Sequence, residues 1–115
     1  FGYSLSLSSD GNTLAVGAFK EWSNATGING DQTNNKAHYS GAAYVFTRTG
    51  ETWTQQAYLK ATNTAISDNF GHNLTLSSDG NTLAVGAYAE DGGTFGVNGD
   101  ITNNTSSVAG AVYLY

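Results

Sequence analysis

The feature that most constrains this chain is an internal repeat. Residues 1–18 read FGYSLSLSSDGNTLAVGA and residues 70–87 read FGHNLTLSSDGNTLAVGA, an offset of 69 residues. The same offset holds without a gap for the later motifs, for example residues 27–31 (GINGD) and residues 96–100 (GVNGD). Self-similarity at a long fixed period is typical of repeat architectures, in which each copy is one structural unit. The chain is therefore predicted to fold as copies of a single unit.

The repeat divides the chain into two units. We predict that the first unit spans residues 1–69 and that a second, truncated unit spans residues 70–115. Within the first unit, residues 3–8 alternate between apolar residues and serine, which is the period of a half-buried strand. The Asp-Gly-Asn sequence at residues 10–12 is a strong tight-turn signal, so this strand is expected to continue through a hairpin into residues 13–18.

Two further segments complete the first unit. Residues 41–48 are apolar on both faces, which is typical of a central strand, and residues 52–60 alternate in the manner of a fourth strand. The second unit repeats the first three strands, and no segment has helical periodicity. We therefore predict an all-β fold of four-stranded antiparallel meanders, with one complete sheet and one three-stranded sheet. A β-sandwich built from the same meanders is the alternative.

The composition excludes several classes of partner. The net charge is −5 and only four residues are basic, so no nucleic-acid partner is expected. No apolar run approaches the roughly 20 residues of a membrane span, so no membrane insertion is expected. The chain contains no Cys, Met or Pro. The missing Met leads us to expect that an N-terminal segment was removed, and the Ser-, Thr-, Asn- and Gly-rich composition predicts an exported prokaryotic protein of the cell surface.

The motifs of the repeat resemble those of a known family. Phe-Gly opens one strand at residues 1–2, Gly-Ala closes the next at residues 17–18, residues 41–46 read GAAYVF and residues 53–59 read WTQQAYL. Together they resemble the FG-GAP repeat, which forms the blades of the integrin α-chain β-propeller, and more closely its bacterial exported relatives. The resemblance implies about one and two-thirds propeller blades in this chain. A propeller has about four to eight blades, so this chain alone would not close one.

The expected function is that of a non-enzymatic extracellular module for adhesion or surface assembly. No catalytic constellation is recognisable, so no catalytic residue is assigned. An unpaired strand edge is a template for another strand, and the last predicted strand has neither Pro nor Lys to block it. The alternative is a fragment of a longer ligand- or carbohydrate-binding propeller, with the remaining blades as its partner. We expect self-association, as a homo-oligomer or a filament, through the edge formed by Gly110, Ala111, Val112, Tyr113, Leu114 and Tyr115.

Two long loops, residues 19–40 and 88–109, carry the candidate metal ligands. Both loops are rich in Asn, Gly and Thr, and both contain Asn-Gly-Asp and Thr-Asn-Asn motifs. Carboxylate and amide oxygens suit calcium, which is therefore a candidate cofactor. The alternative is that these side chains stabilise turns by hydrogen bonds to the backbone. The resemblance also implies that the calcium loop of integrins is absent, because residues 8–12 hold a single carboxylate. The candidate ligands are Asn29, Asp31, Asn34, Asn98, Asp100 and Asn103.

Aromatic residues are candidates for stacking on a sugar ring. Those in predicted strands are expected to fill the core instead. Trp22 and Phe95 lie in the long loops, so they are the candidate contacts for a glycan or protein ligand. The resemblance implies that these loops emerge on the face that integrins use for ligands.

Overall fold

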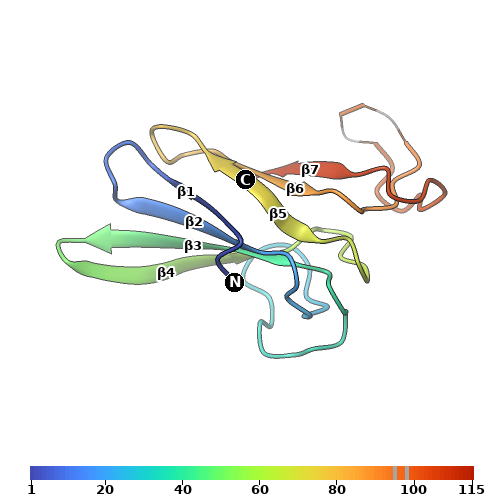
Figure 1. Cartoon of the computed structure of the whole chain (residues 1–115), viewed down its shortest axis with the longest axis horizontal. Helices are drawn as coiled ribbons and strands as arrows, with labels where there is room; N and C mark the ends of the chain where they lie inside the picture. The colour runs from blue at the N-terminus through green and yellow to red at the C-terminus, as the bar shows by residue number, and fades with distance from the viewer. Residues whose placement is uncertain (95, 98) are drawn as a thin grey trace.

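The computed structural model describes residues 1–94, 96–97 and 99–115, and within them the chain is entirely β (Figure 1). The predicted meanders are confirmed, because the two sheets have the orders β1-β2-β3-β4 and β5-β6-β7 and every pairing is antiparallel. The described residues form no helix, and hence none that could cross a membrane. The strands are β1 (Ser4–Leu7), β2 (Thr13–Ala18), β3 (Ala42–Thr49), β4 (Thr52–Leu59), β5 (Phe70–Leu76), β6 (Leu83–Ala87) and β7 (Ala111–Leu114).

The Asp-Gly-Asn turns close the β1–β2 and β5–β6 hairpins in the same way. The Asp10 carboxylate accepts hydrogen bonds from the Ser8 hydroxyl at 2.6 Å and from the Asn12 backbone N–H at 2.9 Å. Gly11 follows with φ +70°, a left-handed conformation that glycine adopts without steric cost. The hydroxyl and amide donors stabilise the charged carboxylate, so the pKa of Asp10 lies below its ordinary value.

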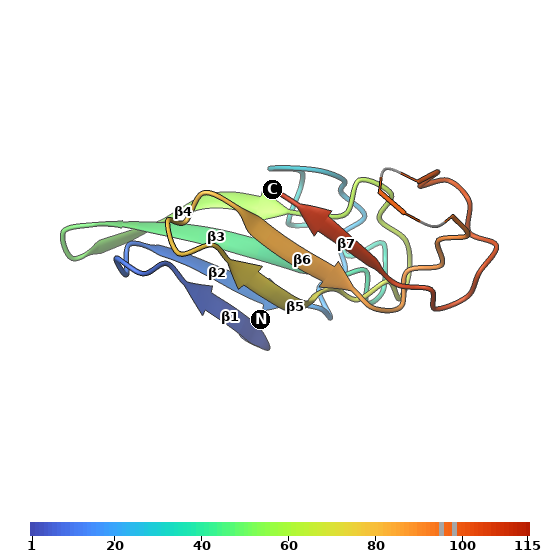
Figure 2. The ribbon, with the colours of Figure 1, turned by 90° about the horizontal axis from the view of Figure 1, so that it is seen from above.

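The long loops lie at the end of the sheets opposite these turns. In Figures 1 and 2 the β1–β2, β3–β4 and β5–β6 turns share one end, whereas both long loops and the connector from β4 to β5 share the other. The loops implied to carry ligands are thus gathered at one end of the molecule.

The core lies between the two sheets. β5 is the strand of the second sheet that lies against β1, β2 and β3 (Figure 2). The first sheet contributes mostly small residues to this interface, such as Ala15 and Ala43, whereas the second contributes larger ones, such as Phe70, Leu83 and Val85. Small side chains opposite large ones allow the two sheets to approach closely.

The face of β1 that the second sheet covers is the serine face. Leu5 is 68% exposed, whereas Ser4 and Ser6 point toward β5. The Ser6 hydroxyl accepts a hydrogen bond from the backbone N–H of Leu76 at 3.0 Å. The serines face inward because the second sheet covers their side of β1, so the leucines form an exposed apolar face instead.

Candidate functional site at the junction of the two repeats

The second Phe-Gly dipeptide inserts into the first repeat. Phe70 is fully buried, with its ring edge-on to those of Tyr113 and Tyr115 at centroid distances of 5.4 and 6.1 Å. Its backbone N–H donates to the Ser40 carbonyl at 3.0 Å, and Phe70 forms a parallel bridge with Gly41. The backbone of the Phe-Gly motif therefore joins the two repeats, while the Phe70 ring packs against tyrosines of its own repeat.

Glycines in the first repeat make room for this insertion. A Cβ atom on Gly17 would lie 2.1 Å from the carbonyl oxygen of Gly71, and one on Gly41 would lie 2.0 Å from that of Phe70. Such distances are far inside van der Waals contact. The Ser4 hydroxyl also donates to the Gly71 carbonyl at 2.9 Å. The Gly-Ala motifs of one repeat thus form a hollow that accepts the Phe-Gly motif of the next.

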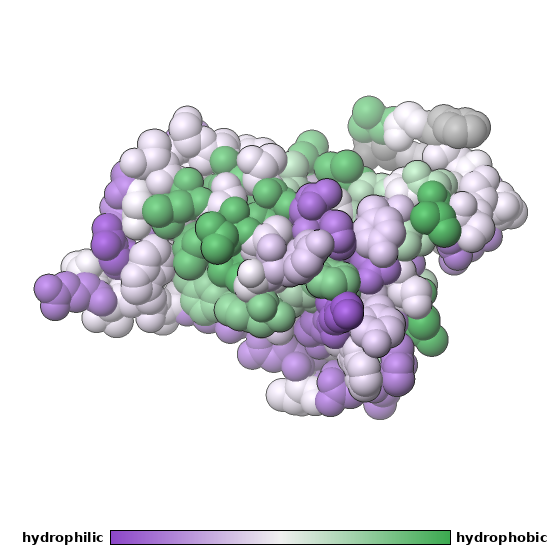
Figure 3. All heavy atoms as spheres, in the orientation of Figure 1, coloured by the Kyte–Doolittle hydropathy of each residue, from purple (hydrophilic) through white to green (hydrophobic). Residues whose placement is uncertain are grey.

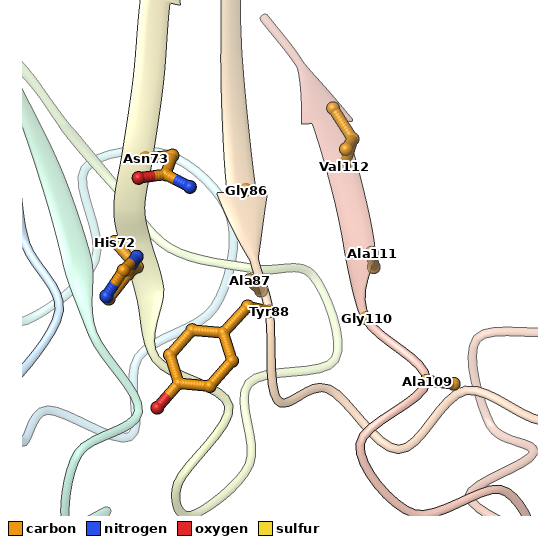
Figure 4. Close-up of a pocket in the computed structure, with 9 residues that line it drawn as sticks. All are labelled: His72, Asn73, Gly86, Ala87, Tyr88, Ala109, Gly110, Ala111 and Val112. Atoms are coloured by element: carbon orange, nitrogen blue, oxygen red, sulfur yellow. The ribbon is translucent and has the colours of Figure 1, made fainter.

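An equivalent hollow lies open on the second repeat. Figure 4 shows Asn73, Gly86 and Val112 around a cavity of about 490 Å³ that β5, β6 and β7 line. A Cβ on Gly86 would meet no described atom closer than 3.6 Å. Gly110 has φ +79° against +82° at Gly41. The open hollow is therefore preformed in the conformation that binds Phe-Gly in the first repeat.

An equivalent Phe-Gly motif is exposed on the first repeat. Phe1 is 77% exposed, and Gly2 has φ +80° against +81° at Gly71. The Phe1 ring rests edge-on against Tyr44 at 5.2 Å on the outer face of the first sheet. Figure 3 shows hydrophobic residues gathered on this side of the molecule, over the region of β1 and β2.

The outer faces of the two sheets are also repeat equivalents of the inner faces that meet at the junction. By strand register, the outer face of the first sheet is formed by Leu5, Leu7, Leu14, Val16, Tyr44 and Phe46. Their repeat equivalents, 69 residues later, form the inner face of the second sheet: Leu74, Leu76, Leu83, Val85, Tyr113 and Tyr115. Conversely, the inner face of the first sheet is equivalent to the outer face of the second. The two outer faces are thus the two halves of the internal junction.

This junction of Phe-Gly and Gly-Ala motifs agrees with the family comparison. The FG-GAP repeat family matches residues 53–115, which is more than half of the chain and runs from β4 through β7. The chain belongs to the FG-GAP repeat family. Comparison with curated proteins and with solved structures gives no significant match. The all-β meanders are therefore partial blades of a propeller-like FG-GAP module, as the sequence motifs predicted.

A buried polar cluster supports the first FG-GAP repeat, and sequence reasoning missed it. Lys60 is fully buried, and its ammonium contacts the Glu21 carboxylate at 3.0 Å and the Ser40 hydroxyl at 2.7 Å. The Tyr58 hydroxyl donates to the same Glu21 oxygen at 2.9 Å. Burial lowers the pKa of Lys60, although Glu21 opposes this shift. The only signal in the sequence was that Glu21 recurs as Glu90.

In the first FG-GAP repeat, the predicted metal ligands form hydrogen bonds that stabilise turns. The Asp31 carboxylate accepts from the Thr33 hydroxyl and N–H, which lower the pKa of Asp31. Asn34 donates to the Ser23 hydroxyl, and the Asn29 side-chain oxygen accepts from the backbone of β4. These contacts are those of the alternative interpretation, in which the side chains stabilise turns.

The ligands predicted in the second FG-GAP repeat follow the same pattern where they are described. Asp100 accepts from Thr102, and the pKa of Asp100 is lowered by these bonds, while Asn103 accepts from Thr105. Asn98 lies outside the described residues. Within the described part of the chain, no group of three acidic or histidine side chains is arranged to hold a metal. Calcium binding by these loops stays a prediction.

The two predicted ligand-binding aromatics differ in what the structure describes. The Trp22 ring stacks on His38 with a centroid distance of 4.0 Å and an interplanar angle of 12°, and Tyr39 lies edge-on to it. Phe95 lies outside the described residues. Binding of a ligand by Trp22 stays a prediction.

The predicted assembly edge is the outer strand of the second sheet. β7 pairs only with β6 among the described strands. Val112 and Leu114 are exposed on its outer face. Tyr113 and Tyr115 point inward, where the Tyr115 hydroxyl donates to the Lys60 carbonyl at 2.8 Å and burial raises the pKa of Tyr115 to about 12.

Proposed function

We propose that this chain is a non-enzymatic extracellular assembly module, in which blades of successive copies pack head to tail. One observation carries the proposal. The exposed Phe1-Gly2 motif and the open hollow at Gly86 are repeat equivalents of the two sides of the internal junction. A surface that fits a different surface on the next copy forms either a closed ring or an open filament. Adhesion through such an array is the biological role that this arrangement favours.

The composition supports an extracellular setting for this assembly. The chain is poor in Lys and free of Cys, and Ser, Thr, Asn and Gly supply most of its polarity. The exposed apolar residues of the first sheet gather on a single face. Exposed apolar patches of this kind are typical of interaction surfaces.

The test is the oligomeric state of the 115-residue chain and of a variant with the hollow filled. Sedimentation velocity over a wide concentration range should show growing association for the natural sequence. Gly86→Val should remain monomeric, because the added side chain occupies the space needed for the Phe-Gly backbone. Thr82→Val, placed before β6 and away from the hollow, should associate normally. A natural sequence that stays monomeric at high concentration would contradict the proposal.

Glycan binding is a second candidate function, and the aromatic group on the first long loop supports it. Trp22 and His38 are stacked, Tyr39 is exposed beside them, and the Lys20 ammonium lies 5.6 Å from the Tyr39 ring centre. Flat aromatic surfaces of this kind suit the apolar faces of sugars. A glycan array with the natural chain and Trp22→Ala tests this function. Binding that is equal for both would exclude a role for Trp22.

A further inference from the structure

In the first repeat, strand β4 lies in a slot between β3 and the first long loop. The backbone N–H of Lys60 donates to the Gly27 carbonyl at 2.8 Å, and that of Asn29 donates to the Tyr58 carbonyl at 2.7 Å. Ile28 and Leu59 form an antiparallel bridge. The Gly-Ile-Asn-Gly motif at residues 27–30 therefore binds the free edge of β4, so that β4 has backbone partners on both sides.

The end of β4 is also fixed by charge. Lys60 follows β4 directly and forms the single ion pair of the described residues, with Glu21. Glu21 is held in place by the backbone N–H of Ser23, which donates to its other carboxylate oxygen at 2.8 Å. A partly buried carboxylate at the start of the loop thus forms an ion pair with a fully buried lysine at the end of the inserted strand.

The second repeat has the same slot without a strand in it. A cavity of about 780 Å³ lies between β7 and the second long loop, and its lining includes Glu90, Gly96, Val97 and Tyr113. Val97, the repeat equivalent of Ile28, is 92% exposed. β7 is the repeat equivalent of β3, so both walls of the slot are present.

Glu90 occupies the position of Glu21 but forms no ion pair within the described part of the chain. It is only 4% exposed, and the backbone N–H of Gly92 donates to it at 2.8 Å, as that of Ser23 does to Glu21. Its other described partner is the neutral amide of Asn63, at 2.9 Å. Asp68 is also buried, and its pKa is raised by burial first and then by the charges of Glu90 and Asp91. Acidic side chains therefore gather at this end of the slot, and among the described residues Glu90 has no ion-pair partner.

We propose that this slot binds a strand from a further FG-GAP repeat, antiparallel to β7, whose terminal lysine forms an ion pair with Glu90. The β3–β4 register places Leu59 opposite Ala43 and Tyr58 opposite Tyr44. In the proposed complex, the added strand accordingly places a leucine opposite Val112 and a tyrosine opposite Tyr113. This inference rests on the proposed assembly function, and it identifies the strand that would pair with the exposed edge of β7.

The test uses a synthetic peptide with the sequence of residues 52–61, TWTQQAYLKA, and the 115-residue chain. The peptide should bind with shifts of the β7 backbone amide signals in NMR spectra. A Lys60→Gln peptide should bind about tenfold or more weakly, since a charge-assisted hydrogen bond to a buried carboxylate is lost. Glu90→Gln in the chain should weaken binding of the natural peptide to a similar degree. Glu51→Gln, at the exposed β3–β4 turn, is the matched charge control and should change nothing.

A double-mutant cycle distinguishes the proposed ion pair from non-specific peptide binding and from folding defects. The two substitutions should not add, because either one removes the same ion pair. Equal binding of the natural and Lys60→Gln peptides to the natural chain would overturn the inference without any variant chain. Gly86→Val, which blocks face-to-face packing, should leave peptide binding intact. Peptide binding by a chain that never self-associates would refute the assembly proposal and leave this inference standing.

Discussion

The two Phe-Gly motifs have the same sequence and nearly the same backbone, yet their surroundings are opposite. Phe70 is buried between the sheets, whereas Phe1 is mostly exposed. The equivalent glycines differ in the same way. Gly17 packs against the carbonyl group of Gly71, whereas Gly86 borders an open cavity. The motif therefore does not encode burial by itself.

The difference shows that the two faces of each repeat are the two complementary halves of one interface. Every repeat presents a large apolar face with Phe-Gly and a small-residue face with the glycine hollow. Within the chain one pair of these faces meets, and among the described strands no other sheet packs against the remaining two. Paired variants at equivalent positions can therefore separate the contributions of a motif to folding from its contributions to assembly.

The largest contrast is expected between Phe70→Ala and Phe1→Ala. Truncation of a buried Phe loses its transfer free energy and leaves a cavity, so Phe70→Ala should lower the free energy of unfolding by about 3–5 kcal/mol. Phe1→Ala should lower it by less than about 1 kcal/mol, because the ring is already exposed to water. Urea unfolding followed by circular dichroism measures both. Similar losses for the two variants would mean that Phe1 also supports the fold.

The next contrast is between Glu21→Gln and Glu90→Gln. Glu21→Gln leaves the buried Lys60 ammonium without its carboxylate, and breaking such a pair costs about 3 kcal/mol. Glu90→Gln removes a charge that has no cationic partner among the described residues, so stability should change little or rise. Thermal unfolding of the two variants at neutral pH gives the comparison. A larger loss for Glu90→Gln would show that its charge already has a partner.

A smaller contrast is expected between Gly17→Ala and Gly86→Ala. The new methyl group on residue 17 would overlap the Gly71 carbonyl, and overpacking of this kind costs about 1–3 kcal/mol. At residue 86 the methyl group has room, so the monomer should keep its stability. Unfolding curves at low protein concentration measure the monomer alone. Equal destabilisation would indicate that the strand, and not the junction, requires glycine.

All seven strands of the described residues could be predicted from the sequence, because an alternating or continuous apolar pattern marked each of them. The repeat supported every prediction except that of β4, which has no second copy in the chain. The orientation of β1 could not. Its alternation defines a leucine face and a serine face, but which one is covered depends on where the second sheet docks. The hydrogen bonds of Ser4 and Ser6 to β5 decide this, and no pattern within residues 3–8 encodes a partner about 70 residues away.

The candidate site was predicted in part. The Phe-Gly and Gly-Ala motifs were recognised, and β7 was recognised as an edge. The ion pair of Glu21 and Lys60 was not, because its members are 39 residues apart and lie in a loop and at a strand end without shared periodicity. Side-chain chemistry in the loops was ambiguous as well, since the oxygen atoms that suit calcium also suit the turns that the structure contains.

The smallest expected effect concerns acid, and here the two repeats should agree. The carboxylates of Asp10 and Asp79 each accept from a serine hydroxyl at 2.6 Å, and these bonds, with those of the neighbouring Asn, lower the pKa of both carboxyls below 3.8. The unfolded chain then binds more protons than the folded chain between the folded and unfolded pKa values. Stability from these turns is thus fully present above about pH 4 and lost as the pH falls through the folded values.

The agreement follows because every bond that lowers these two pKa values lies inside its own turn. Among the described residues, the hydrogen bonds between the two turns run from the Ser9 N–H and hydroxyl to the Ser78 carbonyl, and they do not involve either carboxylate. An NMR titration of the carboxyl carbons should therefore give equally lowered pKa values for Asp10 and Asp79, in the natural chain and in Gly86→Val. A normal value for Asp79 beside a lowered value for Asp10 would show that docking between repeats, and not the local sequence, forms the turn.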